Sequence, residues 1–162
     1  MQPTKIKLAR ESGFTIIELL VVLMIIAVLF TLSTINLGQA QVTASLSSTT
    51  NTLLADLRSQ QILAMSGDIG STSTNQPQGV YITSNNYTLF AGNSYSGGDP
   101  NNFSVSTNSI TLSTTFASNQ VVFNKGDGSV TGFSSGNNSI TLSSNGESKI
   151  ITINRFGATS VN

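Results

Sequence analysis

The first part of the chain carries a continuous run of apolar residues. From residue 16 to residue 32 every position is apolar except Glu18 and Thr31, and no further charge follows up to Leu37. A helix needs about 20 such residues to cross the hydrocarbon core of a bilayer. The sequence therefore predicts a transmembrane helix over residues 14–37.

A periodic pattern of apolar residues follows this run. Five apolar residues share one face of a helical wheel: Val42, Leu46, Leu53, Leu57 and Ala64. Such a stripe is typical of an amphipathic helix that packs against a domain. We therefore expect an amphipathic continuation over residues 38–66, and with it a single helix of about fifty residues. The run from Gly67 to Pro77, rich in Gly, Ser and Thr, has the composition of a helix stop and a loop.

Beyond Pro77 apolar and polar residues alternate, as in half-buried strands. The expected strands are residues 79–83, 87–91, 109–113, 120–124, 129–133, 139–143 and 149–154. Two tight reversals are expected at residues 125–128 and at Asn145-Gly146, because Asp, Asn and Gly tolerate positive φ. Residues 92–102, rich in Gly, Asn and Ser, predict a mobile surface loop.

These elements predict an α+β fold. A sheet with one apolar face must bury that face, and the stripe on the helix offers a matching surface. We expect a long N-terminal helix packed on an antiparallel β-sheet, within a β-rich globular domain over residues 67–162. Its size allows one core rather than two.

Charge places the amino terminus on the cytoplasmic side of the membrane. Lys5, Lys7 and Arg10 precede the apolar run, and no basic residue follows until Arg58. The positive-inside rule then predicts an N-in, C-out orientation in the cytoplasmic membrane. Only 9% of residues are charged and there is no Cys, so an exported domain must be held by core burial and sheet hydrogen bonds.

Glu18 is the exception within the apolar run. A carboxylate deep in a membrane costs about 2.5 to 3.5 kcal/mol and usually has a partner. No Lys, Arg or His lies in the run to pair with it. If the chain is cut after Gly13, the new amine of Phe14 is the cation that lies closest to Glu18 in membrane depth. Because the geometry within one chain is poor, the amine of a neighbouring helix is the better partner, and Glu18 is interpreted as an assembly contact.

The string from Gly13 to Val22 resembles the processing and methylation motif of type IV pilins and type II secretion pseudopilins. The resemblance implies cleavage after Gly13 by prepilin peptidase, N-methylation of Phe14, and a role for Glu18 in registering one subunit against the next. Other pilin or pseudopilin subunits and an inner-membrane assembly platform are the implied partners. Many major pilins carry a Pro within the helix, and its absence here favours a minor subunit.

A second resemblance covers the end of the chain. Residues 121–132, 140–142 and 150–159 are similar to the closing region of H-type minor pseudopilins and their FimT-like pilus relatives, which end with a strand after a Gly. Some FimT-like subunits bind DNA through arginines in this segment, and Arg155 is the one candidate here. After processing, four basic residues face six acidic ones, so nucleic acid is not the expected partner.

Catalysis and metal binding are not expected. The chain has no His and no Cys, and Lys125 and Lys149 fall at a turn and a strand where solvated charges are usual. Asp99, Asp127 and Glu147 are too far apart in sequence to form an EF-hand type of calcium loop. Three alternatives remain: a filament subunit, a DNA receptor within a pilus, and an adhesive or inert membrane-anchored domain. The sequence leaves a secretion pseudopilus, a type IV pilus and a competence filament open.

Overall fold

The computed structural model describes residues 13–66 and 76–162, without the side chains of residues 32–37. The predictions for the leader before Gly13, and for the helix-stopping run at residues 67–75, lie outside these ranges. The chain divides into two compact units, Met1–Ala40 and Gln41–Asn162. Each unit is described separately below.

One helix, α1, extends from Ile16 to Ser66 over 51 residues, as the two apolar patterns together predict. No Pro interrupts it, since the nearest prolines in the sequence are Pro3 and Pro77. Within the described residues, no helix combines the length and apolar character that a membrane crossing requires. The transmembrane segment at residues 14–37 therefore stays a prediction.

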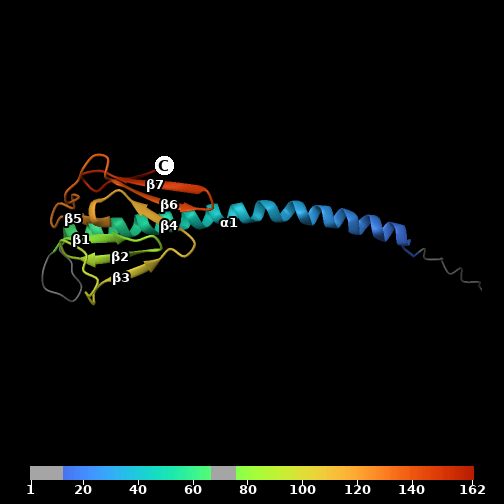
Figure 1. Ribbon diagram of the computed structural model, residues 1–162, viewed down its shortest axis with the longest axis horizontal. Helices are drawn as coiled ribbons and strands as arrows, with labels where there is room; N and C mark the ends of the chain where they lie inside the picture. The colour runs from blue at the N-terminus through green and yellow to red at the C-terminus, as the bar shows by residue number, and fades with distance from the viewer. Residues whose placement is uncertain (1–12, 67–75) are drawn as a thin grey trace, which may run out of the picture. The chain divides into compact units, whose positions relative to one another are not determined.

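The second unit contains two four-stranded antiparallel sheets on the part of α1 that begins at Gln41 (Figure 1). Sheet A has the order β3-β2-β1-β5 and sheet B the order β4-β6-β7-β8. The strands of sheet A are β1 Gln78–Ile82, β2 Asn86–Ala91, β3 Phe103–Ser106 and β5 Gln120–Phe123. Those of sheet B are β4 Thr111–Thr114, β6 Ser139–Ser144, β7 Glu147–Ile153 and β8 Thr159–Val161. The α+β class, with an N-terminal helix on antiparallel sheets, agrees with the predicted pilin fold.

The core lies where the stripe of α1 meets both sheets. Leu53 and Leu57 are completely buried, as are Val80 of sheet A and Ile140 of sheet B. The other members of the stripe, Leu46 and Ala64, belong to the same cluster, whereas Val42 is half-buried. Thr50 and Gln60 are also buried on α1, although their polar character hides them from an apolar pattern.

The hairpin predicted around Asn145-Gly146 is present, and β1 and β2 form another hairpin. β1 pairs with β2, and β6 pairs with β7 with Ile140 opposite Ile151. The turn residues Asn145 and Gly146 have φ of 48° and 85°. Positive φ at both positions is the requirement of a two-residue hairpin turn, which explains why an Asn-Gly pair predicts it.

Four details of the strand prediction were wrong. Residues 129–133 form no strand and contribute a single bridge between Val130 and Phe123. β3, which was not predicted, begins directly after the expected loop, and the expected strand at 109–113 starts later, as β4. The single expected sheet is divided into two. Alternation identifies which residues face a core, but it does not specify which strand edges pair.

The predicted loop at residues 92–102 is held against the outer face of sheet A. The ring of Tyr95 stacks on Tyr81 with a centroid distance of 4.1 Å, and its backbone N–H donates to Gln120 Oε1 at 3.0 Å. The carboxylate of Asp99 accepts the backbone N–H of Asn101 at 2.9 Å, which closes a turn. The loop position is confirmed, and its mobility stays a prediction.

Candidate functional site

The predicted cleavage position lies at the amino-terminal end of the described chain, outside regular structure. Gly13 is exposed, and a Cβ at this position would meet no atom within 4 Å. Phe14 is 80% exposed. The backbone between these residues is therefore open to an enzyme that must reach it.

Thr15 begins the helix. Its Oγ1 accepts the backbone N–H of Glu18 at 3.3 Å, and its carbonyl accepts the N–H of Leu19 at 3.1 Å. A Thr at the N-cap with a Glu three positions later is the pattern of a capping box. The pattern is readable in the sequence, and sequence reasoning missed it. It places the Glu18 carboxylate in the first turn of α1, where the helix dipole favours a negative charge.

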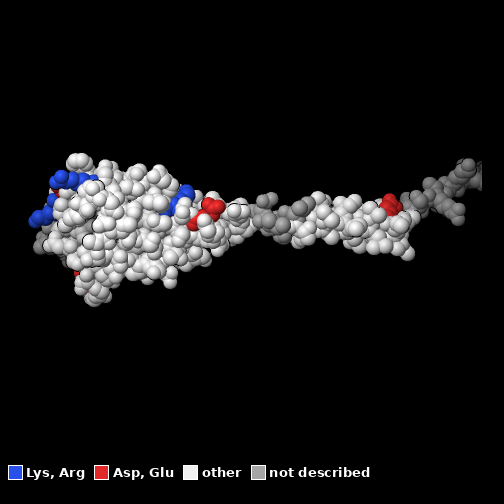
Figure 2. All heavy atoms as spheres, turned by 45° about the horizontal axis from the view of Figure 1, so that its top comes forward, with Lys and Arg blue, Asp and Glu red and all other residues white. Residues whose placement is uncertain are grey.

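Glu18 is exposed and has no ion-pair partner within the described residues. It is the only charged residue from Gly13 to Ala55. In Figure 2 the helix nearest the grey amino-terminal trace is accordingly uncharged apart from one acidic group. Gly13, Phe14 and Glu18 thus lie within one short segment. The first basic residue that follows them in the sequence is Arg58.

The first part of α1 exposes apolar side chains in every direction. Between Phe14 and Phe30 every large apolar residue is exposed, from 44% for Val22 to 82% for Ile16. A helix that is apolar all round is normally buried in a large assembly or in a membrane. The chain therefore carries a surface here that the rest of its first unit does not cover.

Residues 8–34 match the family model of the prokaryotic N-terminal methylation motif. This span includes Gly13, Phe14 and Glu18. The match supports a type IV pilin-like subunit, a structural class rather than an enzymatic one, and with it processing by prepilin peptidase and assembly with other pilin subunits. It ends before the strands that resemble H-type pseudopilins. Comparisons with curated proteins and with solved structures found no match.

Arg155 lies in an exposed turn at the other end of the sequence. The turn is closed by Asn154, whose Oδ1 accepts the backbone N–H groups of Phe156 and Ala158 at 2.9 and 3.0 Å. The phenyl ring of Phe156 is 75% exposed. The carbonyl of Arg155 accepts the N–H of Val130 at 2.9 Å, so this turn lies beside the reversal at residues 125–128.

Gln61 of α1 fastens these two turns together. Its Nε2 donates to the carbonyl of Gly128 at 3.0 Å and to that of Phe156 at 2.8 Å. Gly157 has φ of 79°, and a Cβ there would lie 2.2 Å from the same Nε2. Lys125 and Arg155 are consequently on adjacent turns. Figure 2 shows basic side chains at both ends of the globular unit.

Asp127 and Asp99 accept hydrogen bonds from their own turns. Asp127 accepts the backbone N–H and the hydroxyl of Ser129, both at 3.0 Å, and these bonds lower the pKa of its carboxyl. Asp99 closes its own turn, and Glu147 begins β7. Within the described residues no three acidic, His or Cys side chains gather as a metal site would require.

One polar contact between α1 and sheet A was not predicted from the sequence. The hydroxyl of Tyr87, which is 1% exposed, donates to Asp56 Oδ2 at 2.5 Å. Burial and this hydrogen bond raise the pKa of the Tyr87 hydroxyl far above its usual value. The two residues are 31 positions apart, and no local pattern signals such a pair.

Proposed function

We propose that this protein is a minor pilin or minor pseudopilin. In this proposal it is inserted N-in into the cytoplasmic membrane through residues 14–37 and is cut after Gly13. The long helix then joins a filament while the β domain remains on the exterior or at the tip. The observation that carries the proposal is the methylation motif at residues 8–34, located on a helix whose apolar surface has no cover in its own unit.

The proposed mechanism is assembly. An apolar helix keeps apolar surroundings when it moves from lipid into a bundle of similar helices, so its apolar side chains favour no particular axial position in the bundle. The carboxylate of Glu18, which has no ion-pair partner among the described residues of its own chain, then determines the axial position of one subunit relative to the next. Glu18 would be neutralised by the amine of Phe14 on a neighbouring subunit, displaced along the helix axis. An opposite charge within hydrogen-bond distance offsets much of the desolvation cost that an isolated carboxylate bears.

Mass spectrometry of the amino terminus tests the processing step. In cells that contain prepilin peptidase, the mature chain should begin at a methylated Phe14. Gly13→Leu should leave the full precursor, because a bulky side chain replaces the small residue at the cut. Thr4→Leu, in the leader, is the matched control and should be processed normally. A wild-type chain that retains Met1 in such cells would contradict the proposal.

The resemblance of the last strands favours an H-type subunit of a type II secretion pseudopilus or of a type IV pilus. The strand β8 after Gly157 has the place that this resemblance predicts. Incorporation assays in strains that carry one machine or the other separate the two assignments.

A second candidate is a FimT-like subunit that binds DNA during natural transformation. Arg155 and Lys125 lie on adjacent turns beside the exposed ring of Phe156, and cations with an exposed aromatic ring are what a single-stranded nucleic acid requires. The overall charge argues against it, since acidic residues outnumber basic ones after processing.

Measuring DNA retention against salt concentration decides this second candidate. Affinity that falls steeply with added salt, and falls again on Arg155→Ala, would support DNA binding. Lys149→Ala, which changes the same charge within sheet B, is the control. We expect no salt-sensitive retention at low ionic strength.

A further inference from the structure

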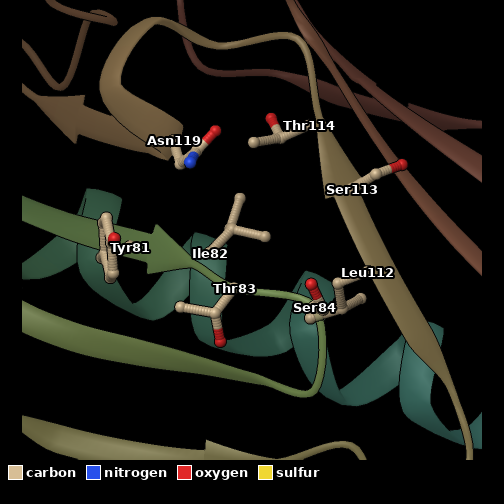
Figure 3. A pocket seen from close by; sticks show the side chains of 8 residues that line it. All are labelled: Tyr81, Ile82, Thr83, Ser84, Leu112, Ser113, Thr114 and Asn119. Carbon is tan, nitrogen blue, oxygen red and sulfur yellow. The ribbon is translucent and has the colours of Figure 1, made fainter.

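A gap opens between the two sheets, where the end of β1 lies opposite the free edge of β4 (Figure 3). Its volume is about 360 Å³. Ile82 and Leu112, both buried, form its apolar floor, and Asn119 lies across its opening. The gap belongs entirely to the second unit.

The gap exists because β5 covers only part of β1. Pairing between these strands ends at Tyr81 opposite Gln120. The preceding residue, Asn119, has φ of 55°, and its N–H donates to the carbonyl of Phe116 instead of to β1. Beyond this point β1 turns toward sheet B, and Ser84 accepts the N–H of Leu112 at 2.8 Å.

The backbone of β4 presents hydrogen-bonding groups to this gap. Residues in an antiparallel strand direct their N–H and C=O groups alternately to the two sides. Leu112 donates toward Ser84, whereas Thr115 donates to Ser139 of β6 at 3.0 Å. Thr114 therefore directs its N–H and C=O to the same side as Leu112, which is the side of the gap.

β1 contributes in the same way. Thr83 donates its N–H to the carbonyl of Asn86 in β2 at 2.9 Å, so Ile82, one position earlier, directs its backbone groups away from β2 and toward the gap. The bond between Leu112 and Ser84 shows that the outer edge of β4 already pairs with a second strand at one end. Past that bond the two edges separate.

The side chains around the gap carry no charge, and two of their hydroxyls are already used. Thr114 Oγ1 donates to the carbonyl of Ser139 at 2.9 Å, and Thr83 Oγ1 donates to the carbonyl of Asn86 at 2.9 Å. The backbone groups of Ile82 and Thr114 are thus among the polar groups that face the gap, together with the side chains of other lining residues. Main-chain edges recognise an extended polypeptide rather than a sugar or an ion.

We propose that the gap receives an extended, uncharged segment of a neighbouring subunit, which adds as a strand to the outer edge of β4. A strand residue occupies about 160 Å³, taking a 3.3 Å rise, 4.8 Å between strands and 10 Å between sheets. The gap accommodates about two such residues at the centre of a longer segment. The uncharged lining excludes segments rich in Lys, Arg, Asp or Glu, because burial would leave their charges unpaired.

The identity of the partner rests on the proposed function, whereas the strand addition can be tested with a synthetic peptide. The probe is a fluorescent acetyl-Ser-Val-Thr-Val-Ser-Thr amide, titrated into the purified full chain in neutral detergent. Saturable binding is expected at millimolar or lower concentrations, with slower hydrogen exchange at the Thr114 amide. The same peptide with N-methylated backbone amides should not bind, because it cannot donate to a strand edge.

Two variants of the chain locate the binding. Thr114→Pro removes the N–H that faces the gap and should weaken binding about tenfold, the effect of one hydrogen bond. Val161→Pro is the matched control, since it removes an N–H from the outer edge of β8. Ser84→Trp fills the mouth of the gap without changing a backbone bond, and should abolish binding. Thermal melts establish that each variant is folded.

Three outcomes would overturn the proposal. The first is equal binding of the N-methylated peptide, and the second is displacement of the peptide by maltose, which would indicate a sugar site. The third is the absence of saturable binding to the folded wild-type chain at millimolar peptide. None of them depends on cleavage after Gly13 or on Glu18. A failure here therefore leaves the processing and assembly tests unaffected, and a failure there leaves the peptide result in place.

Discussion

The two halves of α1 differ in apolar content and in surroundings. In the first half every large apolar side chain up to Phe30 is exposed, whereas in the second half Leu53, Leu57 and Ala64 are completely buried against two sheets. The second half has one stripe because it has one domain to cover. The first half has no stripe because nothing in its own unit selects a face.

This difference separates folding from assembly. Leu53 and Leu57 contribute to the stability of the globular unit, because removing buried methylene groups costs transfer energy and leaves a cavity. Leu23, which is 55% exposed, makes no such contribution within the chain. The same residue type thus acts within the molecule in one half and, in our proposal, between molecules in the other.

Replacing Glu18 should have the largest effect and should fall entirely on assembly. Glu18→Leu is expected to leave membrane insertion, cleavage and the melting temperature of the domain unchanged, and to abolish incorporation into filaments, measured by immunoblotting of sheared filaments. Only the backbone N–H of residue 18 takes part in the Thr15 cap, so the helix start is kept.

Two further variants sharpen the result. Glu18→Gln keeps the shape without the charge and should also fail to assemble, whereas Thr15→Ala weakens the cap and keeps the carboxylate, so assembly should persist. Normal incorporation of Glu18→Leu would refute the proposed contact.

Truncating one leucine in each half gives the next largest effect. Leu53→Ala should lower the free energy of unfolding by about 2 to 5 kcal/mol, because the side chain is completely buried. Leu23→Ala, the matched change in the exposed half, should leave domain stability within about 0.5 kcal/mol. Urea titration of both variants in detergent measures the difference. Equal losses would show that the two halves do not differ as described.

The contact between Tyr87 and Asp56 predicts a smaller, pH-dependent effect on the second half alone. The pKa of Tyr87 is higher in the folded chain than the value of about 10 expected when unfolded. The folded state then keeps its proton where the unfolded state loses it, so this contribution is complete below about pH 10 and is lost as pH rises further. The loss should approach about 1.4 kcal/mol per pH unit.

Tyr87→Phe is the control for this pH dependence. It should lower stability at neutral pH by about 1 to 3 kcal/mol, because Asp56 loses its donor, and it should remove the alkaline decline. Melting temperatures from pH 7 to 11 measure both effects. An unchanged alkaline decline in Tyr87→Phe would assign it to another group.

The sequence by itself determined the features that depend on local periodicity and turn chemistry. The length of α1 and most of its buried stripe follow from the spacing of apolar residues, and the β6–β7 hairpin follows from Asn145 and Gly146. The candidate site was also readable from sequence, because Gly13, Phe14 and Glu18 lie within six positions. Even the Thr15 cap, which was overlooked, is a local pattern.

Only the tertiary structure decided which distant groups meet. The division into two sheets, the contact of Tyr87 with Asp56, the bridging of two turns by Gln61 and the gap beside β4 all join residues far apart in the chain. The alternation of apolar and polar residues shows that a strand has an apolar face, but it does not specify which other strand pairs with it. Strand edges and long-range hydrogen bonds are chosen by the packing of the whole unit, because many pairings bury the same apolar residues and only one also satisfies the backbone.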